Sequence, residues 1–147
     1  MRIEAFLKES PMFAVSRAAR RFEGLAARCL AADGLSFFEG LTLAALFFEA
    51  PRPVKPSQLA ESFSTTRGNV SHCVSSLEAK GHLQRRIDPE DARAYQLVLK
   101  PQGKRVAVRV IAALDRVQKE FEAETGKVAL HEMLSALCRL EERALAR

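Results

Sequence analysis

Apolar residues recur at helical spacing through most of the chain. Between residues 11 and 32, several follow one another at intervals of three and four, which places them on one face of a helix. They are Ala14, Ala18, Phe22, Leu25 and Cys29. A second helix is expected from Ser36, which can cap it while Glu39 reaches back to the cap. Its apolar run to Phe48 predicts a buried helix that ends before Pro51.

Two shorter helices are predicted after the proline loop. The first covers about residues 58–63, with Ser57 as its candidate cap. The second is capped by Thr66 and runs to about Lys80, with Gly81 as a left-handed stop. Its inward face consists of Val70, Cys73, Val74 and Leu77. Two short helices joined by a tight turn are typical of a helix-turn-helix.

The second half of the chain predicts a hairpin and two longer helices. Strand-like runs at residues 83–87 and 94–99 enclose a charged segment, which indicates a hairpin with a long, projecting turn. From Pro101 a long helix runs to Gly126, and a last helix follows. The sequence therefore predicts a mainly α fold with a small β-hairpin wing: a winged helix-turn-helix with long N- and C-terminal helices. These long helices carry more apolar surface than so small a module can cover, so we expect them to meet a second copy.

Composition narrows the choice of partners. The chain has 147 residues, a net charge of +5 and a pI of about 9.4, which favours an anionic partner such as nucleic acid. Cys29, Cys73 and Cys138 lack the spacing of a disulfide framework or a zinc site. We expect reduced thiols that pack as small apolar groups, with a redox switch at Cys73 as the alternative. No metal and no cofactor are expected.

Other functional classes find no support in the sequence. The opening residues include Glu4, Lys8 and Glu9, and no stretch approaches eighteen uncharged apolar residues. We therefore expect a cytoplasmic protein with no membrane partner. The sequence shows no glycine-rich phosphate loop, paired-carboxylate motif or nucleophile–base arrangement, so we do not expect an enzyme.

Residues 58–104 carry a specific set of motifs. They comprise a helix with "LA", a second helix ending in "V-x-x-LE-x-KG", an arginine, a "DPxDxR" turn and a glycine near the start of the next helix. In this pattern the chain resembles the MarR (multiple antibiotic resistance regulator) family of winged-helix transcription regulators. The resemblance implies a single domain over residues 1–147. It assigns residues 36–100 to a DNA-binding lobe, and residues 1–35 and 101–147 to a helical dimerisation region.

The resemblance also implies a DNA-binding site. The helix at residues 66–80 would lie in the major groove of double-stranded DNA, Arg93 of the wing would reach the minor groove, Asp91 would support the wing, and a homodimer would bind a palindrome. The helical wheel independently turns a polar side outward. The candidate DNA-binding residues are Thr66, Arg67, Gly68, Asn69, Ser71, His72, Ser75, Ser76 and Arg93. Arg93 and Asp91 can alternatively form a solvent-exposed ion pair.

The chain also departs from the family pattern. His72 and Ser76 stand where arginine is common in the recognition helix, and Glu90 and Ala92 stand where basic residues are frequent in the wing. Fewer contacts to phosphates predict a shallower salt dependence and weaker non-specific binding. His72 and Arg67 can also be solvated surface residues without a role.

Aromatic residues suggest a binding pocket for a small lipophilic or aromatic effector, in the place where ligands of the family often bind. The candidates are Phe22, Phe37, Phe38 and Phe47, which can equally be core residues at this spacing. Arg17, Arg20 and Arg21 can supply a charge for a carboxylate ligand or form a solvated helix face. The function that fits best is a ligand-responsive repressor. The alternative is a winged-helix protein-interaction module without specific DNA binding.

Overall fold

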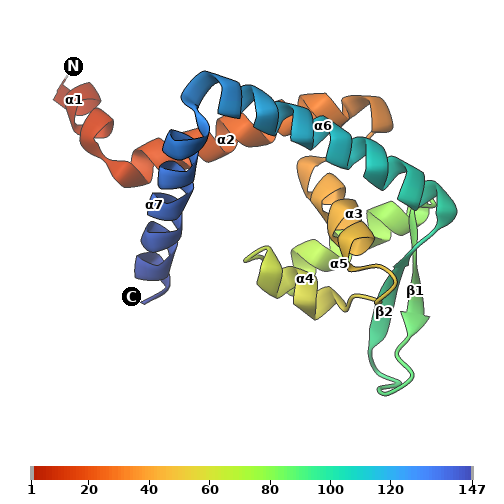
Figure 1. The fold of residues 1–147 in the computed structure, drawn as a ribbon. Helices are drawn as coiled ribbons and strands as arrows, with labels where there is room; N and C mark the ends of the chain where they lie inside the picture. The colour runs from red at the N-terminus through yellow and green to blue at the C-terminus, as the bar shows by residue number, and fades with distance from the viewer. Residues whose placement is uncertain (1, 147) are drawn as a thin grey trace. The chain divides into compact units, whose positions relative to one another are not determined.

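The computed structural model describes residues 2–146 and is mainly helical (Figure 1). Its elements are α1 (Arg2–Glu9), α2 (Pro11–Leu30), the 3-10 helix η1 (Ala31–Asp33), α3 (Phe37–Glu49), α4 (Pro56–Ser62), α5 (Arg67–Ala79), β1 (Leu83–Ile87), β2 (Tyr95–Leu99), α6 (Pro101–Thr125) and α7 (Lys127–Leu145). This order confirms the predicted helices and hairpin. Helix α1 was not predicted, because only two turns precede Pro11 and they carry too few residues to show a period.

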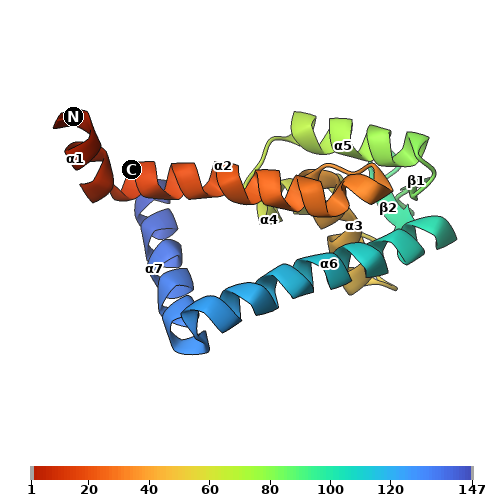
Figure 2. The same cartoon turned by 90° about the horizontal axis from the view of Figure 1, so that it is seen from above.

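The contacts divide the chain into two units, the first ending at Ile111 and the second beginning at Ala112. The first unit contains the winged helix-turn-helix with α1 and α2. The second contains the remainder of α6 and α7, and the chain changes direction between them at Gly126 (Figure 2). Within residues 2–146, no single helix has both the length and the apolar composition to cross a membrane, and only α2–η1 with α3, a pair bent by 73°, passes that test together.

The core of the first unit forms around α3 and one face of α5. Its fully buried apolar side chains are Leu30, Leu43, Val70, Val74, Leu77, Leu83, Leu97 and Val110. The predicted inward stripe of α5 is confirmed, because all of its members are buried. Burial of one such Val or Leu side chain stabilises a fold by about 1.5–3 kcal/mol, so this stripe fixes how α5 is turned about its own axis.

Two predicted helix starts are confirmed by their caps. The hydroxyl of Ser36 accepts a hydrogen bond from the backbone N–H of Glu39 at 3.1 Å, and the Glu39 carboxylate accepts one from the N–H of Ser36 at 2.9 Å. Thr66 accepts from the N–H of Asn69 at 3.1 Å at the start of α5. Each cap contributes about 1 kcal/mol to helix stability.

The predicted cap of α4 is wrong. Helix α4 begins at Pro56, one residue before Ser57, and Lys55 takes the cap position. The N–H of Lys55 donates to the side chain of Gln58 at 2.8 Å. Proline suits the first helical position because its fixed φ is helical and its missing N–H would have no helical partner there.

Helix α2 turns a different face to its own unit than the periodicity predicted. Ala26 and Leu30 are buried, whereas Phe22, on the predicted inward stripe, is 48% exposed. The helix thus keeps apolar side chains partly exposed to solvent. Periodicity identifies such a stripe but does not say whether the same chain or another molecule covers it.

The three thiols lie in different surroundings. Cys73 is buried, as predicted, with its sulfur 3.4 Å from the hydroxyl of Thr42, and burial raises the pKa of this thiol. Cys29 and Cys138 are exposed, so their predicted packing as buried apolar groups is wrong. In the described part of the chain, no group of three or more His, Cys, Asp or Glu side chains could hold a metal ion.

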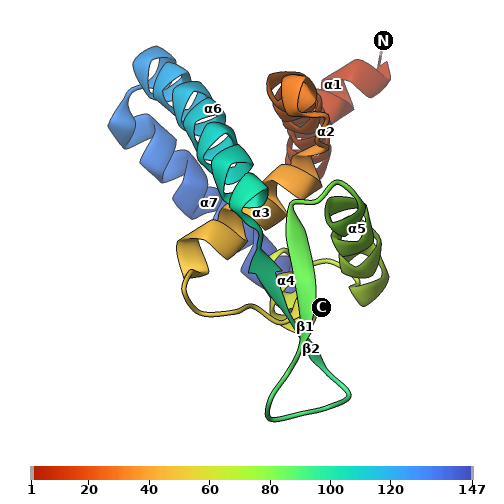
Figure 3. The ribbon, with the colours of Figure 1, turned by 90° about the vertical axis from the view of Figure 1, so that its right-hand side faces the viewer.

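The hairpin is anchored to the helices at its base. Strands β1 and β2 pair antiparallel, from Leu83 opposite Leu99 to Ile87 opposite Tyr95. Val54, in the loop before α4, adds a bridge to Leu97, whose N–H donates to the Val54 carbonyl at 2.8 Å. Residues 88–94 form the long turn that projects beyond the helices of this unit (Figure 3).

A nearly buried carboxylate joins α3 to α5. Glu39, which is 7% exposed, accepts a hydrogen bond from the hydroxyl of Ser76 at 2.6 Å and pairs with the ammonium group of Lys80 at 2.9 Å. Lys80 also donates to the carbonyl of Gly34 at 2.8 Å. We call Glu39, Ser76 and Lys80 the Glu39 clamp. It attaches the C-terminal end of α5 to the start of α3.

The pKa of Glu39 reflects two opposing effects. Burial alone would raise the pKa of this carboxyl, but hydrogen bonds from Ser76, Lys80 and the Ser36 N–H together outweigh burial, and the pKa lies below its ordinary value of 4.5. A carboxylate with a lowered pKa stabilises the fold above its unfolded pKa, and this stabilisation is lost as the pH falls through the folded pKa. The clamp is therefore complete at neutral pH.

Glu39→Gln is expected to lower the free energy of unfolding at neutral pH by about 1–3 kcal/mol, because Ser76 and Lys80 lose a charged acceptor. Chemical denaturation between about pH 6 and about pH 3 should show a smaller loss of stability in this variant than in the wild type. Glu61→Gln, at an exposed position of α4, is the charge-matched control. Equal pH dependence in Glu39→Gln and the wild type would contradict the clamp.

Candidate nucleic-acid interface

Helix α5 presents a polar face opposite its buried stripe. The candidate residues that are exposed on this helix and at its cap are Thr66, Arg67, Gly68, Asn69, Ser71, His72 and Ser75. Their side chains are small or can donate hydrogen bonds, and Gly68 has no side chain. The buried stripe therefore leaves on the outside a surface of the kind that reads base edges and phosphates.

Two of the predicted residues hold the helix in place. Ser76 is half-buried and belongs to the Glu39 clamp, so the outward direction predicted for it is wrong. Ser75 accepts a hydrogen bond from the guanidinium of Arg85 at 2.9 Å, and the same guanidinium pairs with Glu78. Arg85 also lies over the ring of Tyr95, 5.3 Å from its centroid. The side chain of Arg85 thus links β1 of the wing to α5.

The remaining polar side chains of this face divide into two groups. The Asn69 side chain donates to the hydroxyl of Thr65 at 3.1 Å, and the Thr66 hydroxyl is used by the helix cap. For Arg67, Ser71 and His72, no side-chain hydrogen bond or ion pair is found within residues 2–146. These three are available to a ligand without breaking an internal contact.

The wing is shaped by two aspartates. The Asp88 carboxylate pairs with the ammonium group of Lys55 at 2.6 Å and accepts from the N–H of Glu90 at 3.0 Å. These contacts, that from Lys55 foremost, hold the pKa of Asp88 below its ordinary value. The Asp91 carboxylate accepts from the backbone N–H of Arg93 at 3.0 Å. The two aspartates thereby fix the backbone of the turn.

Arg93 projects from this turn and is exposed. The ion pairs found within residues 2–146 do not join its guanidinium to Asp91, so the alternative of a surface ion pair between the two side chains is not supported. Asp91 acts on Arg93 through the backbone, and the guanidinium stays available. The sequence pattern pointed to both residues but not to this division of roles, because an Asp two residues before an Arg suits either a turn or a side-chain pair.

A surface groove of about 380 Å³ lies between the starts of α4, α5 and β2. Its lining consists of Lys55, Pro56, Ser57, Arg67, Ser71, Ala94 and Tyr95. Lys55 was not among the predicted site residues, since nothing in the local sequence marks a lysine that pairs across to the wing. The groove places the free groups of Arg67 and Ser71 beside the base of the wing.

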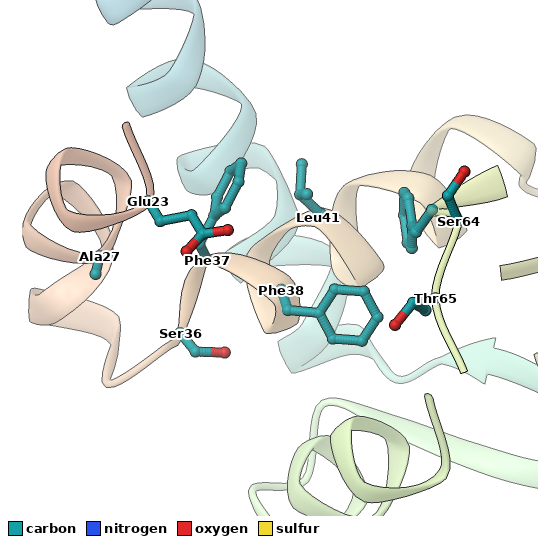
Figure 4. Close-up of a pocket in the computed structure, with 9 residues that line it drawn as sticks. Glu23, Ala27, Ser36, Phe37, Phe38, Leu41, Ser64 and Thr65 are labelled. Atoms are coloured by element: carbon teal, nitrogen blue, oxygen red, sulfur yellow. The ribbon is translucent and has the colours of Figure 1, made fainter. Parts of the chain in front are cut away.

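A second cavity, of about 590 Å³, lies beside α3 (Figure 4). Its lining consists of Glu23, Ala27, Ser36, Phe37, Phe38, Leu41, Phe63, Ser64 and Thr65. Phe37 and Phe38 line it, as expected for an effector pocket. Phe22 and Phe47 are not in the lining, and Phe47 instead packs edge to face on Phe48 with ring centroids 6.2 Å apart.

Comparison with known proteins shows which sequences the chain resembles. The model of the MarR family matches residues 50–95, which run from the loop before α4 into the first residue of β2. Over 105 residues the chain is 27% identical to the HTH-type transcriptional regulator PrsX of Escherichia coli. That match covers 71% of this chain and 63% of PrsX, so the chain spans less than two thirds of the relative's length.

Solved structures agree with this fold. The S. aureus MepR–DNA complex superimposes with a TM-score of 0.85 at 16% identity, covering 91% of this chain and 98% of MepR. PcaV from Streptomyces coelicolor, solved with its natural ligand, gives a TM-score of 0.83 at 22% identity, covering 94% and 96%. At these identities the structures establish the MarR-like winged-helix fold. With the family match over residues 50–95 and the sequence relative, they show that the chain is similar to the MarR family of winged-helix transcriptional regulators.

Proposed function

We propose that the chain is a DNA-binding transcription regulator that binds a palindromic duplex as a homodimer and responds to a small ligand. The observation that carries the proposal is the polarity of α5: its apolar stripe is fully used in the core, while Arg67, Ser71 and His72 are exposed and have no side-chain partner among the described residues 2–146. A helix of this kind, supported from behind and joined to a wing, fits the major groove.

The small residues of α5 favour close approach to the duplex. Gly68 and Ser71 put no large side chain between the helix backbone and the groove, and a Cβ at Gly68 would meet only the Thr66 hydroxyl at 3.8 Å. Ser71 can donate to or accept from a base edge, and His72 can donate to a base or a phosphate. Arg67, at the first position of α5, can reach the phosphate backbone.

The wing supplies the second contact. Arg93 is exposed on a turn whose backbone is fixed by Asp88 and Asp91, so its guanidinium can enter a minor groove without a large loss of loop entropy. Lys55 at the base of the wing is neutralised by its ion pair with Asp88. Few unpaired cations therefore face the duplex. The logarithm of the binding constant should fall only gently with the logarithm of the salt concentration, because the slope is about −0.9 for each phosphate neutralised.

Dimerisation is supported by apolar side chains that each unit leaves uncovered. In α7, Met133, Leu134 and Leu140 are 46–48% exposed although they lie on one helical stripe. In α2, Met12 and Val15 are 85% and 40% exposed. Exposed apolar stripes of this length are costly in water, and a second copy that covers them would also pair two recognition helices on a palindrome.

A response to a small ligand is supported by the cavity of Figure 4, which lies between α2, α3 and the turn before α5. PcaV, which shares the fold, was solved with its natural ligand. A repressor released by its ligand is the simplest regulator of this kind, because a ligand that binds the DNA-free form more tightly shifts the equilibrium away from the complex.

Arg93→Ala is expected to weaken binding to a selected duplex by about 1–3 kcal/mol, because a groove contact is lost. Ser71→Ala should relax base preference at one position of each half-site. Both are measured by selecting duplexes from a random pool and titrating the best sequence by fluorescence anisotropy. Arg20→Ala, which removes the same charge from α2, is the control and should bind as the wild type does.

Unchanged affinity and base preference in both variants would contradict the assignment of α5 and the wing as the DNA-binding surface. If no duplex bound even at low salt while a protein partner co-purified, the groove face would serve protein interaction instead.

Leu134→Glu is expected to convert a dimer into a monomer, because a charge would be buried in an apolar contact. Light scattering coupled to size exclusion measures the molar mass, and circular dichroism shows that the helices persist. Arg139→Glu, an exposed charged position of the same helix, is the control and should remain dimeric. A wild-type protein that runs as a single subunit at micromolar concentration would contradict the proposed homodimer.

A further inference from the structure

The cavity beside α3 has one charged group in its lining, and that group is negative (Figure 4). The carboxylate belongs to Glu23 of α2, which is exposed and has no ion pair or hydrogen bond to the side chains described in residues 2–146. The lining contains no Lys, Arg or His. A ligand that carries a carboxylate would therefore meet a like charge and no counter-ion.

The three arginines that could have supplied a charge for a carboxylate ligand, Arg17, Arg20 and Arg21, are absent from the lining. Arg17 lies over the ring of Phe13, 5.4 Å from its centroid, and Arg20 donates to the hydroxyl of Ser16 at 3.1 Å. Glu23 is thus the charged side chain that a ligand in this cavity would contact.

Aromatic rings make up the rest of the binding chemistry. Phe37, Phe38 and Phe63 line the cavity, and the Phe38 and Phe63 rings meet edge to face with centroids 5.5 Å apart. The face of an aromatic ring attracts a cation that sits within about 6 Å of it. A carboxylate beside several such rings is the arrangement that selects quaternary ammonium and other lipophilic cations over anions of the same size.

We propose that this cavity binds a lipophilic organic cation, such as an aromatic amine or a quaternary ammonium compound. Glu23 supplies the counter-charge, and Phe37, Phe38 and Phe63 supply the apolar and cation–π contacts. The volume of about 590 Å³ is in the range of cavities that hold a small-molecule ligand.

Hydrogen bonds link the cavity lining to both ends of the recognition helix, and this consequence rests on the proposed regulator function. Thr65 of the lining accepts from the Asn69 side chain at the start of α5. Ser36 of the lining forms the capping box with Glu39, whose carboxylate holds Ser76 at the other end. A ligand that shifts these walls would move α5 at two points, which couples occupancy to DNA affinity.

The proposal is tested on the DNA-free dimer by calorimetry with three probes of one shape class: benzyltrimethylammonium, benzyl alcohol and benzoate. The cation should bind at least about fivefold more tightly than either of the other probes. This difference in affinity is the one expected from one exposed ion pair. Glu23→Gln should reduce this preference to the part that the aromatic rings supply, and Glu23→Lys should shift it towards benzoate. Glu61→Gln is the charge-matched control outside the lining and should bind as the wild type does.

Equal affinity for the three probes, or unchanged cation binding in Glu23→Gln, would overturn the proposal. Because these measurements contain no DNA, they are independent of the proposed function. If the protein bound the cation but no duplex, the proposed regulator function would be wrong and the proposed cation site would still hold. In a protein that does bind its duplex, benzyltrimethylammonium should lower the affinity for DNA in the wild type and not in Glu23→Gln.

Discussion

Burial of Val70, Val74 and Leu77 against α3 and the hairpin is the interaction on which the rest of the structure depends. Each of these side chains contributes about 1.5–3 kcal/mol, more than the net 0.5–1.5 kcal/mol of a typical hydrogen bond. Turning α5 by one residue would expose this stripe and bury polar groups without partners. The apolar stripe thus sets which side of the helix faces outward, and polar contacts adjust its exact position.

Those polar contacts come from three directions. The Glu39 clamp fixes the C-terminal end of α5 to α3, Arg85 of β1 holds Ser75 and Glu78, and Thr65 holds the side chain of Asn69. The groups that remain free lie between these attachment points. A helix held in this way presents a defined surface to a duplex, and each attachment is a point where a ligand or a change of pH can alter that surface.

The sequence predicted the fold well because the fold depends on local signals. Helical spacing, the caps at Ser36 and Thr66 and the stop at Gly81 all act over a few residues, and the structure confirms them. The start of α4 at Pro56 and short α1 were missed, because one residue or two turns carry too little pattern.

The candidate site was harder to predict, because its contacts join distant parts of the chain. The pair between Lys55 and Asp88, the clamp between Glu39 and Ser76 and the position of Glu23 in the cavity depend on tertiary proximity. Residue type therefore indicated the surface of α5 correctly but could not separate Ser71, which is free, from Ser76, which is held. Similarly, aromatic spacing found Phe37 and Phe38 but not which phenylalanines share a cavity.

The central claim is that the free polar side of α5 faces a duplex. It is tested most directly by thiol accessibility at position 71, using Ser71→Cys in a background where Cys29 and Cys138 are replaced by serine. The introduced thiol should react rapidly with a maleimide in the free protein and be protected when the selected duplex is added. A thiol that is unreactive in the free protein, or one that reacts equally fast with duplex bound, would contradict the account.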